Sequence, residues 1–262
     1  MIKALPDEPE HVLNLNGMQI STDTYWYDDN GVCHYSDSPV RNKTTQSKDG
    51  SVVVYFDNLA DHLIEHIRQS KIVVGCVAWL TSADVLRALA DVPGGVSIVV
   101  QKEDFLRRDI RTRSNWKTEL RRLYGALKFP YYRCAMDGLV GSLSCACDPT
   151  IDPIRCVGNH NSNKAPAFPR MHHKFLVFCD SSDTTYSDDD GEPWGIRILP
   201  RAVWTGSFNL TYNATLSLEN SVLLTDPDLA AAYYHEWEYI MGLSESLDWE
   251  SEWAAPEWRI GT

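Results

Sequence analysis

Two short segments of the sequence carry residue types that suit the chemistry of a phosphate group. The first, MHHKFLVF (171–178), has the apolar composition of a β-strand but begins with two histidines and a lysine. Side chains alternate along a strand, so His172 and Lys174 should point to one face and His173 to the other. An imidazole beside an ammonium group favours the binding of an anion, and a lysine suits phosphate.

The second segment, TGSFN (205–209), follows about 30 residues later. Gly206 permits close approach of the backbone to a ligand, while Ser207 and Asn209 offer hydrogen bonds to non-bridging phosphate oxygens. Ten residues further, Glu219 could accept the second ring N–H of a histidine and set its tautomer. A lone H-x-K often occurs by chance and G-S-x-N alone could be a turn, but their order beside strands of buried type makes the combination specific.

Together these segments resemble the catalytic half of the phospholipase D superfamily. The motif of that family is H-x-K, then four residues and Asp, followed by G-S-x-N, and the resemblance covers about 51–243. It implies that one histidine attacks phosphorus and forms a phosphohistidine intermediate. A second histidine would protonate the leaving oxygen and then activate water, without any need for a metal.

Carried onto this chain, the resemblance implies a role for each matching residue. His172 would be the nucleophile or the acid, and Lys174 and Asn209 would be phosphate ligands. Ser207 and Glu219 would support them. Fixed donors around a developing charge are the physical basis of such a site.

The chain departs from the family motif at one position. The aspartate is expected at position 179, where this chain has Cys179, with Asp180 next to it. A bulge in the strand could bring Asp180 into place, or the role of the aspartate is unfilled.

The chain also contains a single H-x-K. Lysine is absent two residues after each of these other histidines: His62, His66, His160 and His235. Chemistry that uses two histidines then needs two chains, so we predict a homodimer. A twofold axis through the active site would supply the second His172, Lys174 and Asn209.

Hydrophobic periodicity predicts an α/β fold around these segments. Three apolar strands (51–56, 71–80 and 95–101) alternate with two amphipathic helices, and the later strands cover 171–178, 196–209 and 217–225. A final helix should begin after Asp226, with Pro227 in its first turn. This order predicts a mixed β-sheet flanked by helices on both faces, with one catalytic motif per chain.

Composition suggests how the chain is divided. Residues 1–50 are polar, with turn-forming residues at 28–31, and should form an N-terminal extension with a hairpin. Residues 51–262 should form the catalytic domain. A Cys-rich loop at about 129–170 and an acidic loop at 180–195 interrupt it.

The net charge of −12 argues against a surface coated for nucleic-acid binding. However, residues 102–128 hold nine Lys/Arg and four Asp/Glu, a balance of +5, which leaves −17 elsewhere (15 minus 32). This segment should be largely helical and could track a nucleic-acid backbone through Arg107, Arg108 and Arg111. It fits equally well a solvated helix face paired with acidic neighbours. Trp204 could stack a base, and a role in the core is at least as good an interpretation.

The cysteines leave two interpretations open. A structural zinc site in the inserted loop would use Cys145, Cys147, Cys156 and His160. Their spacing fits no strong zinc-finger template, so scattered free thiols are the simpler interpretation. The seven irregularly spaced cysteines and the lack of an export signal predict a cytoplasmic protein. No apolar run approaches the roughly 20 residues that span a bilayer, so no membrane insertion is expected.

These features predict a metal-independent phosphodiester hydrolase, most consistent with a nuclease that cleaves DNA or RNA. The alternative is a phospholipase D-type hydrolase of phospholipid head groups. It ranks lower because the sequence shows no basic amphipathic helix with a bulky apolar face. A third hypothesis, a dimeric binding module without turnover, fits poorly with the intact His172, Lys174 and Asn209.

Overall fold

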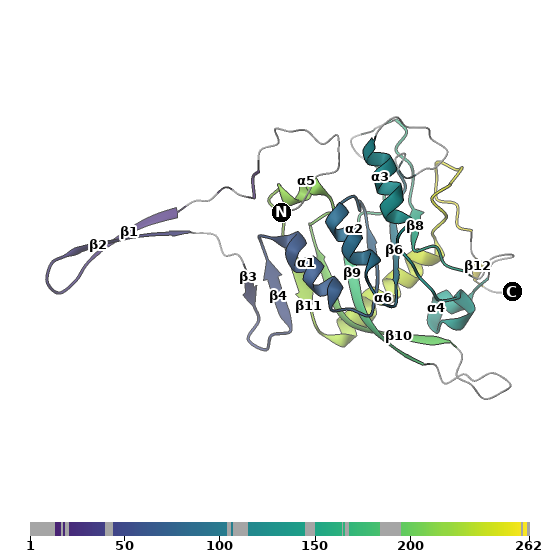
Figure 1. Ribbon diagram of the computed structural model, residues 1–262, viewed down its shortest axis with the longest axis horizontal. Helices are drawn as coiled ribbons and strands as arrows, with labels where there is room; N and C mark the ends of the chain where they lie inside the picture. Colours follow the sequence, from purple (N-terminus) through teal and green to yellow (C-terminus); the bar gives the residue numbers. More distant parts are fainter. Residues whose placement is uncertain are drawn as a thin grey trace.

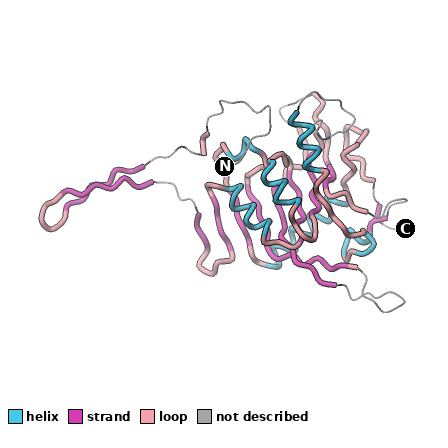
Figure 2. Tube along the Cα trace, in the orientation of Figure 1, coloured by secondary structure: helices cyan, strands magenta, loops and turns pink. Residues whose placement is uncertain are grey.

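The computed structural model places a mixed β-sheet between two layers of helices (Figure 1, Figure 2). It describes residues 14–16, 18, 21–39, 44–103, 106, 115–144, 150–163, 165, 168–183, 195–257 and 259–260. The predicted fold class, a mixed sheet flanked by helices on both faces, is confirmed.

Eight strands form the main sheet. In spatial order they are β3 (Thr44–Gln46), β4 (Val52–Tyr55), β11 (Ser221–Leu224), β10 (Ile196–Gly206), β9 (Lys174–Asp183), β5 (Ile72–Val77), β6 (Val96–Gln101) and β8 (Ile154–Val157). The neighbours β5, β6 and β8 run parallel, as expected for strands joined through helices. The pairs from β3 to β5 are antiparallel.

Helices cover both faces of this sheet (Figure 1). The helices α1 (Leu59–Arg68), α2 (Ala83–Ala90) and α3 (Asn115–Tyr124) lie on one face, and α4 (Gly138–Ser142) and α6 (Pro227–Gly242) lie on the other. Leu86 and Phe178 belong to the buried cluster beneath α1–α3, whereas Phe175 and Trp237 belong to the cluster beneath α6. The predicted N-cap of α6 is confirmed, because the Asp226 carboxylate accepts two backbone N–H groups.

The N-terminal strands β1 (Ser21–Tyr27) and β2 (Cys33–Pro39) form a hairpin that extends away from the sheet (Figure 1). Its turn contains Gly31, whose N–H donates to the Asp28 carbonyl at 2.9 Å and whose φ of 76° favours glycine. Residues 44–46 then join the edge of the main sheet as β3. The boundary expected at residue 50 therefore falls between two paired strands.

The segment expected as an inserted loop contributes a strand to the main sheet. It contains η2 (Arg133–Ala135), α4, β7 (Leu143–Ser144), which pairs with β12 (Arg259–Ile260), and β8. Every side chain of β8 is buried, including Arg155. Its guanidinium is satisfied by Ser244 Oγ at 2.8 Å and Glu257 at 2.5 Å, which explains how the strand tolerates it.

The strand predicted at 171–178 corresponds to β9. It begins at Lys174, three residues later than predicted, and continues to Asp183. The Ala78 N–H, directly after β5, donates to the His173 carbonyl at 2.8 Å. This hydrogen bond fixes the backbone just before β9. Residues 184–194, most of the predicted acidic loop, lie outside the described residues.

Candidate active site

The two predicted segments meet at one edge of the sheet, where β9 begins and β10 ends. In the antiparallel register of these strands Phe175 lies opposite Thr205. The residue before Phe175 is Lys174, and the residue after Thr205 is Gly206, the start of the G-S-x-N segment. The register therefore brings the two motifs side by side, as the resemblance implied.

His172 and Lys174 are in direct contact. The Lys174 Nζ lies 3.1 Å from His172 Nε2 and donates to the His172 carbonyl at 3.0 Å. His173 points to the other face, toward α6, where its Nε2 lies 3.4 Å from a Glu236 carboxylate oxygen. The alternation predicted from the sequence is therefore the arrangement that the structure has.

The surroundings lower the pKa of both groups. Burial lowers the pKa of His172, and the charges of Lys174 and Arg170 lower it further. These contributions favour the neutral imidazole over the imidazolium. Burial also lowers the pKa of Lys174, whereas the Glu219 carboxylate opposes that shift.

Ser207 and Glu219 form one unit. The Ser207 hydroxyl donates to the Glu219 carboxylate and accepts the Asn220 N–H at 3.1 Å. In this single chain the carboxylate thus binds a serine, where the sequence suggested a histidine. Gly206 allows its backbone to lie close to Asn220, because a Cβ at this position would meet the Asn220 carbonyl oxygen. The φ of Gly206 is 152°, a value that other residues rarely adopt.

Asn209 has an unused acceptor. Its Oδ1 is buried and accepts no hydrogen bond from the described residues. The backbone around it is fixed, since the Thr211 N–H donates to the Asn209 carbonyl at 2.8 Å and the Thr211 side chain caps α5 (Tyr212–Thr215). A buried acceptor without a protein partner can take a hydrogen bond from a donor group of a ligand.

Trp79 is a residue of this site that the sequence reasoning missed. It follows β5, and its ring meets the His172 ring edge to face with centroids 5.5 Å apart. Its carbonyl accepts the Leu210 N–H at 3.1 Å, and its indole N–H donates to Glu103 at 3.1 Å. Trp79 thus touches both motifs. Its position near the end of the apolar segment 71–80 was the available signal.

The base-stacking role predicted for Trp204 is wrong. Its side chain is only 2% exposed and stacks on Tyr55 in the core, with ring centroids 5.1 Å apart. The strand irregularity near Asp180 lies in β10, between Pro200 and Ala202, and not in β9. Cys179 is buried beneath α6, and Asp180 lies 3.8 Å from Arg201, far along the strand from Lys174.

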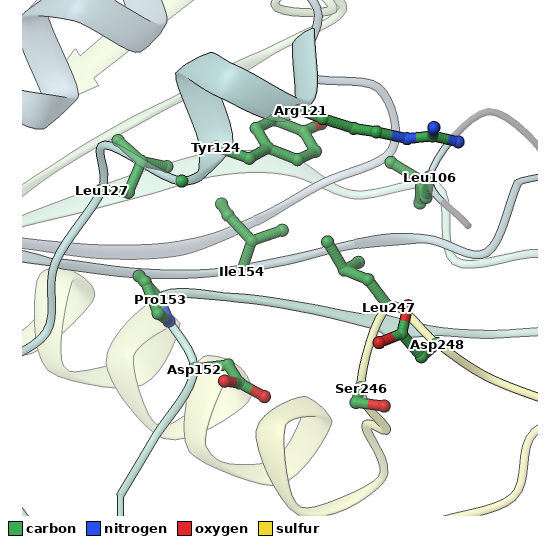
Figure 3. Close-up of a pocket in the computed structure, with 11 residues that line it drawn as sticks. Leu106, Arg121, Tyr124, Leu127, Asp152, Pro153, Ile154, Ser246, Leu247 and Asp248 are labelled. Atoms are coloured by element: carbon green, nitrogen blue, oxygen red, sulfur yellow. The ribbon is translucent and has the colours of Figure 1, made fainter. Parts of the chain in front are cut away.

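The predicted basic residues Arg107, Arg108 and Arg111 lie outside the described residues. On the described part of that segment, Arg122 is paired with Glu119 at 2.7 Å within α3. Arg121 extends along a separate hollow of about 300 Å³, opposite Asp152 and Asp248 (Figure 3). None of the residues at the His172 site lines this hollow, and its remaining lining is largely apolar.

Two of the predicted zinc ligands, Cys145 and Cys147, also lie outside the described residues. Cys156 is buried in β8, where its thiol contacts the Ser246 carbonyl at 3.2 Å and burial raises its pKa to about 12. The ring of His160 packs against Trp249, with centroids 4.9 Å apart. Among the described residues no group of three or more metal-ligating side chains is gathered, so the zinc hypothesis stays a prediction.

The meeting of H-x-K with G-S-x-N at adjacent strand ends, in a mixed sheet covered by helices on both faces, is the arrangement that the resemblance to the phospholipase D superfamily implied. The chain belongs to the same family as uncharacterized protein L381 of Acanthamoeba polyphaga mimivirus. The two are 31% identical over 223 residues, which cover 80% of this chain and 72% of that protein. None of the protein-family models compared with the sequence matches it.

The chain also matches solved structures, at low identity and with TM-scores below 0.5. NucT from Helicobacter pylori is 12% identical, with 74% of this chain and 98% of that chain covered and a TM-score of 0.43. Nuc from Salmonella typhimurium, a phospholipase D family member, is 18% identical, with 75% and 98% covered and a TM-score of 0.41. Separately, no helix among the described residues has the length and apolar character needed to span a membrane.

Proposed function

We propose that the chain is a metal-independent phosphodiesterase that cleaves nucleic acid through a phosphohistidine intermediate. The observation that carries this proposal is the contact of His172 Nε2 with Lys174 Nζ, 3.1 Å apart, beside the G-S-x-N segment. A nucleophile and a phosphate-binding cation are thereby held within reach of one phosphorus atom.

In the proposed reaction a ring nitrogen of His172 attacks phosphorus and the bond to the leaving oxygen breaks. Lys174 and the NH2 group of Asn209 donate hydrogen bonds to the non-bridging oxygens and stabilise their charge. A protonated second histidine gives its proton to the leaving oxygen, then removes one from the water that attacks the phosphohistidine. Hydrolysis of the P–N bond regenerates neutral His172. Glu219 acts through Ser207, which it holds beside the phosphate.

The second histidine is proposed to be His172 of another copy of this chain. Among the described residues of one chain, His172 is the histidine of this segment that shares a face with Lys174. His173 points to the other face, toward α6. A twofold axis near His172 would place the two imidazoles on opposite sides of the phosphorus.

A substrate panel in EDTA tests the reaction. Wild-type protein, His172→Ala and His173→Ala are incubated with single-stranded DNA, double-stranded DNA, RNA and phosphatidylcholine vesicles. We expect cleavage of a nucleic acid that persists in chelator and falls by about 10²–10⁴-fold in His172→Ala but not in His173→Ala. Head-group release alone would favour the phospholipase alternative, and loss of activity in EDTA would contradict the mechanism.

A mixing experiment tests the shared site. Wild-type and His172→Ala chains are unfolded together, refolded at different ratios and assayed. If each active site needs His172 from both copies, the activity per wild-type chain falls in proportion to the wild-type fraction. Constant activity per wild-type chain, or an active monomer in sedimentation, would contradict the dimeric site.

A further inference from the structure

We propose that Trp79 and Arg170 form a subsite that binds a nucleobase of the nucleotide attached to the scissile phosphate. This proposal rests on the proposed function, because it assumes that a phosphodiester is bound at His172. It assigns a substrate class, single-stranded nucleic acid with an accessible base, to a site whose chemistry alone would accept any phosphodiester.

Trp79 is held rigidly at the place where such a base would lie. Its backbone is fixed to the Asn209 segment through the Leu210 N–H, and its indole N–H is fixed to the Glu103 carboxylate at 3.1 Å. The ring is half-buried and its centroid is 5.5 Å from that of His172. A base stacked on the Trp79 ring would therefore belong to the nucleotide whose phosphorus His172 would attack.

Arg170 lies over the same ring. Its guanidinium carbon is 5.8 Å from the Trp79 centroid and 6.0 Å from the Phe168 centroid, and its Nε donates to the Phe168 carbonyl at 3.4 Å. In the part of the chain that the structure describes, no carboxylate forms an ion pair with Arg170. Its charge reaches His172, whose pKa it lowers. The guanidinium is thus a planar cation directed at the site.

The spacing between these two groups suits a stacked ring. Carbon atoms in contact are about 3.5–4.0 Å apart, so a flat ring between indole and guanidinium needs about 7–8 Å. The observed 5.8 Å is short of this by about 1–2 Å. A long arginine side chain with several rotatable bonds can make that movement, whereas the bonded indole stays in place.

The same pair disfavours the lipid alternative. A choline head group would need the aromatic face for its own positive charge. Here Arg170 already places a cation over the Trp79 ring, and Lys174 lies beside His172, so a quaternary ammonium would be repelled. A neutral, electron-rich base is attracted to both members of the pair.

The test compares two oligomers of equal length: a thymidine oligonucleotide and the same sugar–phosphate chain without bases. Both are assayed with wild type, Trp79→Phe, Trp79→Leu and Trp253→Leu. Wild type should prefer the oligomer with bases by about 5- to 150-fold in kcat/KM. Trp79→Phe should keep this preference, and Trp79→Leu should lose it because its kcat/KM falls much more for the oligomer with bases than for the base-free oligomer.

Trp253 is the matched control, because its side chain is 68% exposed and lies in the C-terminal segment. Its substitution should leave the preference intact. A merely structural role for Trp79 predicts a different result, in which Trp79→Leu slows both oligomers by the same factor. That outcome, or a wild-type enzyme without any base preference, would overturn the subsite.

A binding measurement separates this proposal from the proposed function. His172→Ala and the double variant His172→Ala/Trp79→Leu are titrated with both oligomers under conditions where neither is cleaved. Base-dependent binding that disappears with Trp79→Leu supports the subsite even if wild type hydrolyses no nucleic acid. Equal binding of the two oligomers by His172→Ala would overturn the subsite and leave the hydrolysis proposal untouched.

Discussion

The Lys174 ammonium lies 3.1 Å from His172 Nε2 and donates to the carbonyl of the same residue at 3.0 Å. This contact makes the two members of the motif one electrostatic unit. Burial lowers the pKa of His172, and Lys174 and Arg170 lower it further because protonation would place two positive charges side by side.

The pH dependence of activity should follow from this unit. If neutral His172 is the nucleophile, kcat/KM rises with pH through the pKa of His172, and this acid limb lies below the usual histidine value of about 6.5. Lys174→Met removes a positive charge, so the limb should move to higher pH, whatever happens to the maximal rate. Arg170→Met should move it in the same direction. A pH–rate profile for each variant measures the effect, and an unmoved limb would argue against His172 as the titrating group.

The close approach of Gly206 to Asn220 predicts a large effect of one methyl group. In Gly206→Ala the new Cβ meets the Asn220 carbonyl oxygen at a φ of 152°, so strain and collision add, and we expect a loss of about 3 kcal/mol or more. Gly50→Ala is the matched control. Its φ is 76° with nothing near the new Cβ, so only the strain of about 1–2 kcal/mol applies. Denaturant unfolding of both variants compares them, and equal losses would contradict the collision.

Local sequence pattern predicts one half of the site geometry and not the other. The shared face of His172 and Lys174 follows from alternation, which depends only on residues two positions apart. The pairing of Phe175 with Thr205, which joins the two motifs, depends on a register between distant strands. No local pattern encodes it, and here it was implied only by the resemblance to a family.

The choice between Trp204 and Trp79 shows the same limit. When a strand is apolar on both faces, its sequence does not show which aromatic side chain is buried under a helix and which lies at the active site. Trp204 is inside because Tyr55 and His66 from two other elements close over it. Similarly, β8 lies in the segment 129–170 that was predicted as a Cys-rich loop, and it buries Arg155. Its partner Glu257 lies 102 residues away in the sequence.

The buried ion pair of Lys102 and Glu245 should be essential for stability. Lys102 is fully buried, and its Nζ lies 2.5 Å from Glu245 and within 3 Å of the Ser251 and Trp253 carbonyls. Lys102→Met leaves the carboxylate buried without a cation, which should lower the free energy of unfolding by about 3–5 kcal/mol. Replacing Glu245 by Leu as well should recover part of this loss.

The exposed pair of Arg122 and Glu119 is the control for that prediction. Their atoms are 2.7 Å apart, but the Arg122 side chain is 64% exposed, so water screens the interaction. Arg122→Met should leave the denaturation midpoint nearly unchanged. If Arg122→Met and Lys102→Met destabilised the protein equally, burial would not be the reason for the effect.

His66 predicts how stability depends on pH. Its ring is packed against Phe178 and Trp204 and lies 3.2 Å from the Tyr55 hydroxyl, and burial lowers its pKa. The unfolded chain therefore binds a proton at about pH 6.5, while the folded chain binds it only at lower pH.

Between these two pKa values the unfolded state holds more protons, so the free energy of unfolding falls as the pH falls. Each such histidine contributes at most about 1.4 kcal/mol per pH unit, and above about pH 6.5 it contributes no slope. His172, whose pKa is also lowered, adds to the slope. His66→Gln keeps a hydrogen-bonding group near Tyr55 but cannot titrate, so urea unfolding between pH 7 and pH 5 should show a shallower loss of stability than in wild type. A slope unchanged by His66→Gln would mean that other groups take up the protons on unfolding.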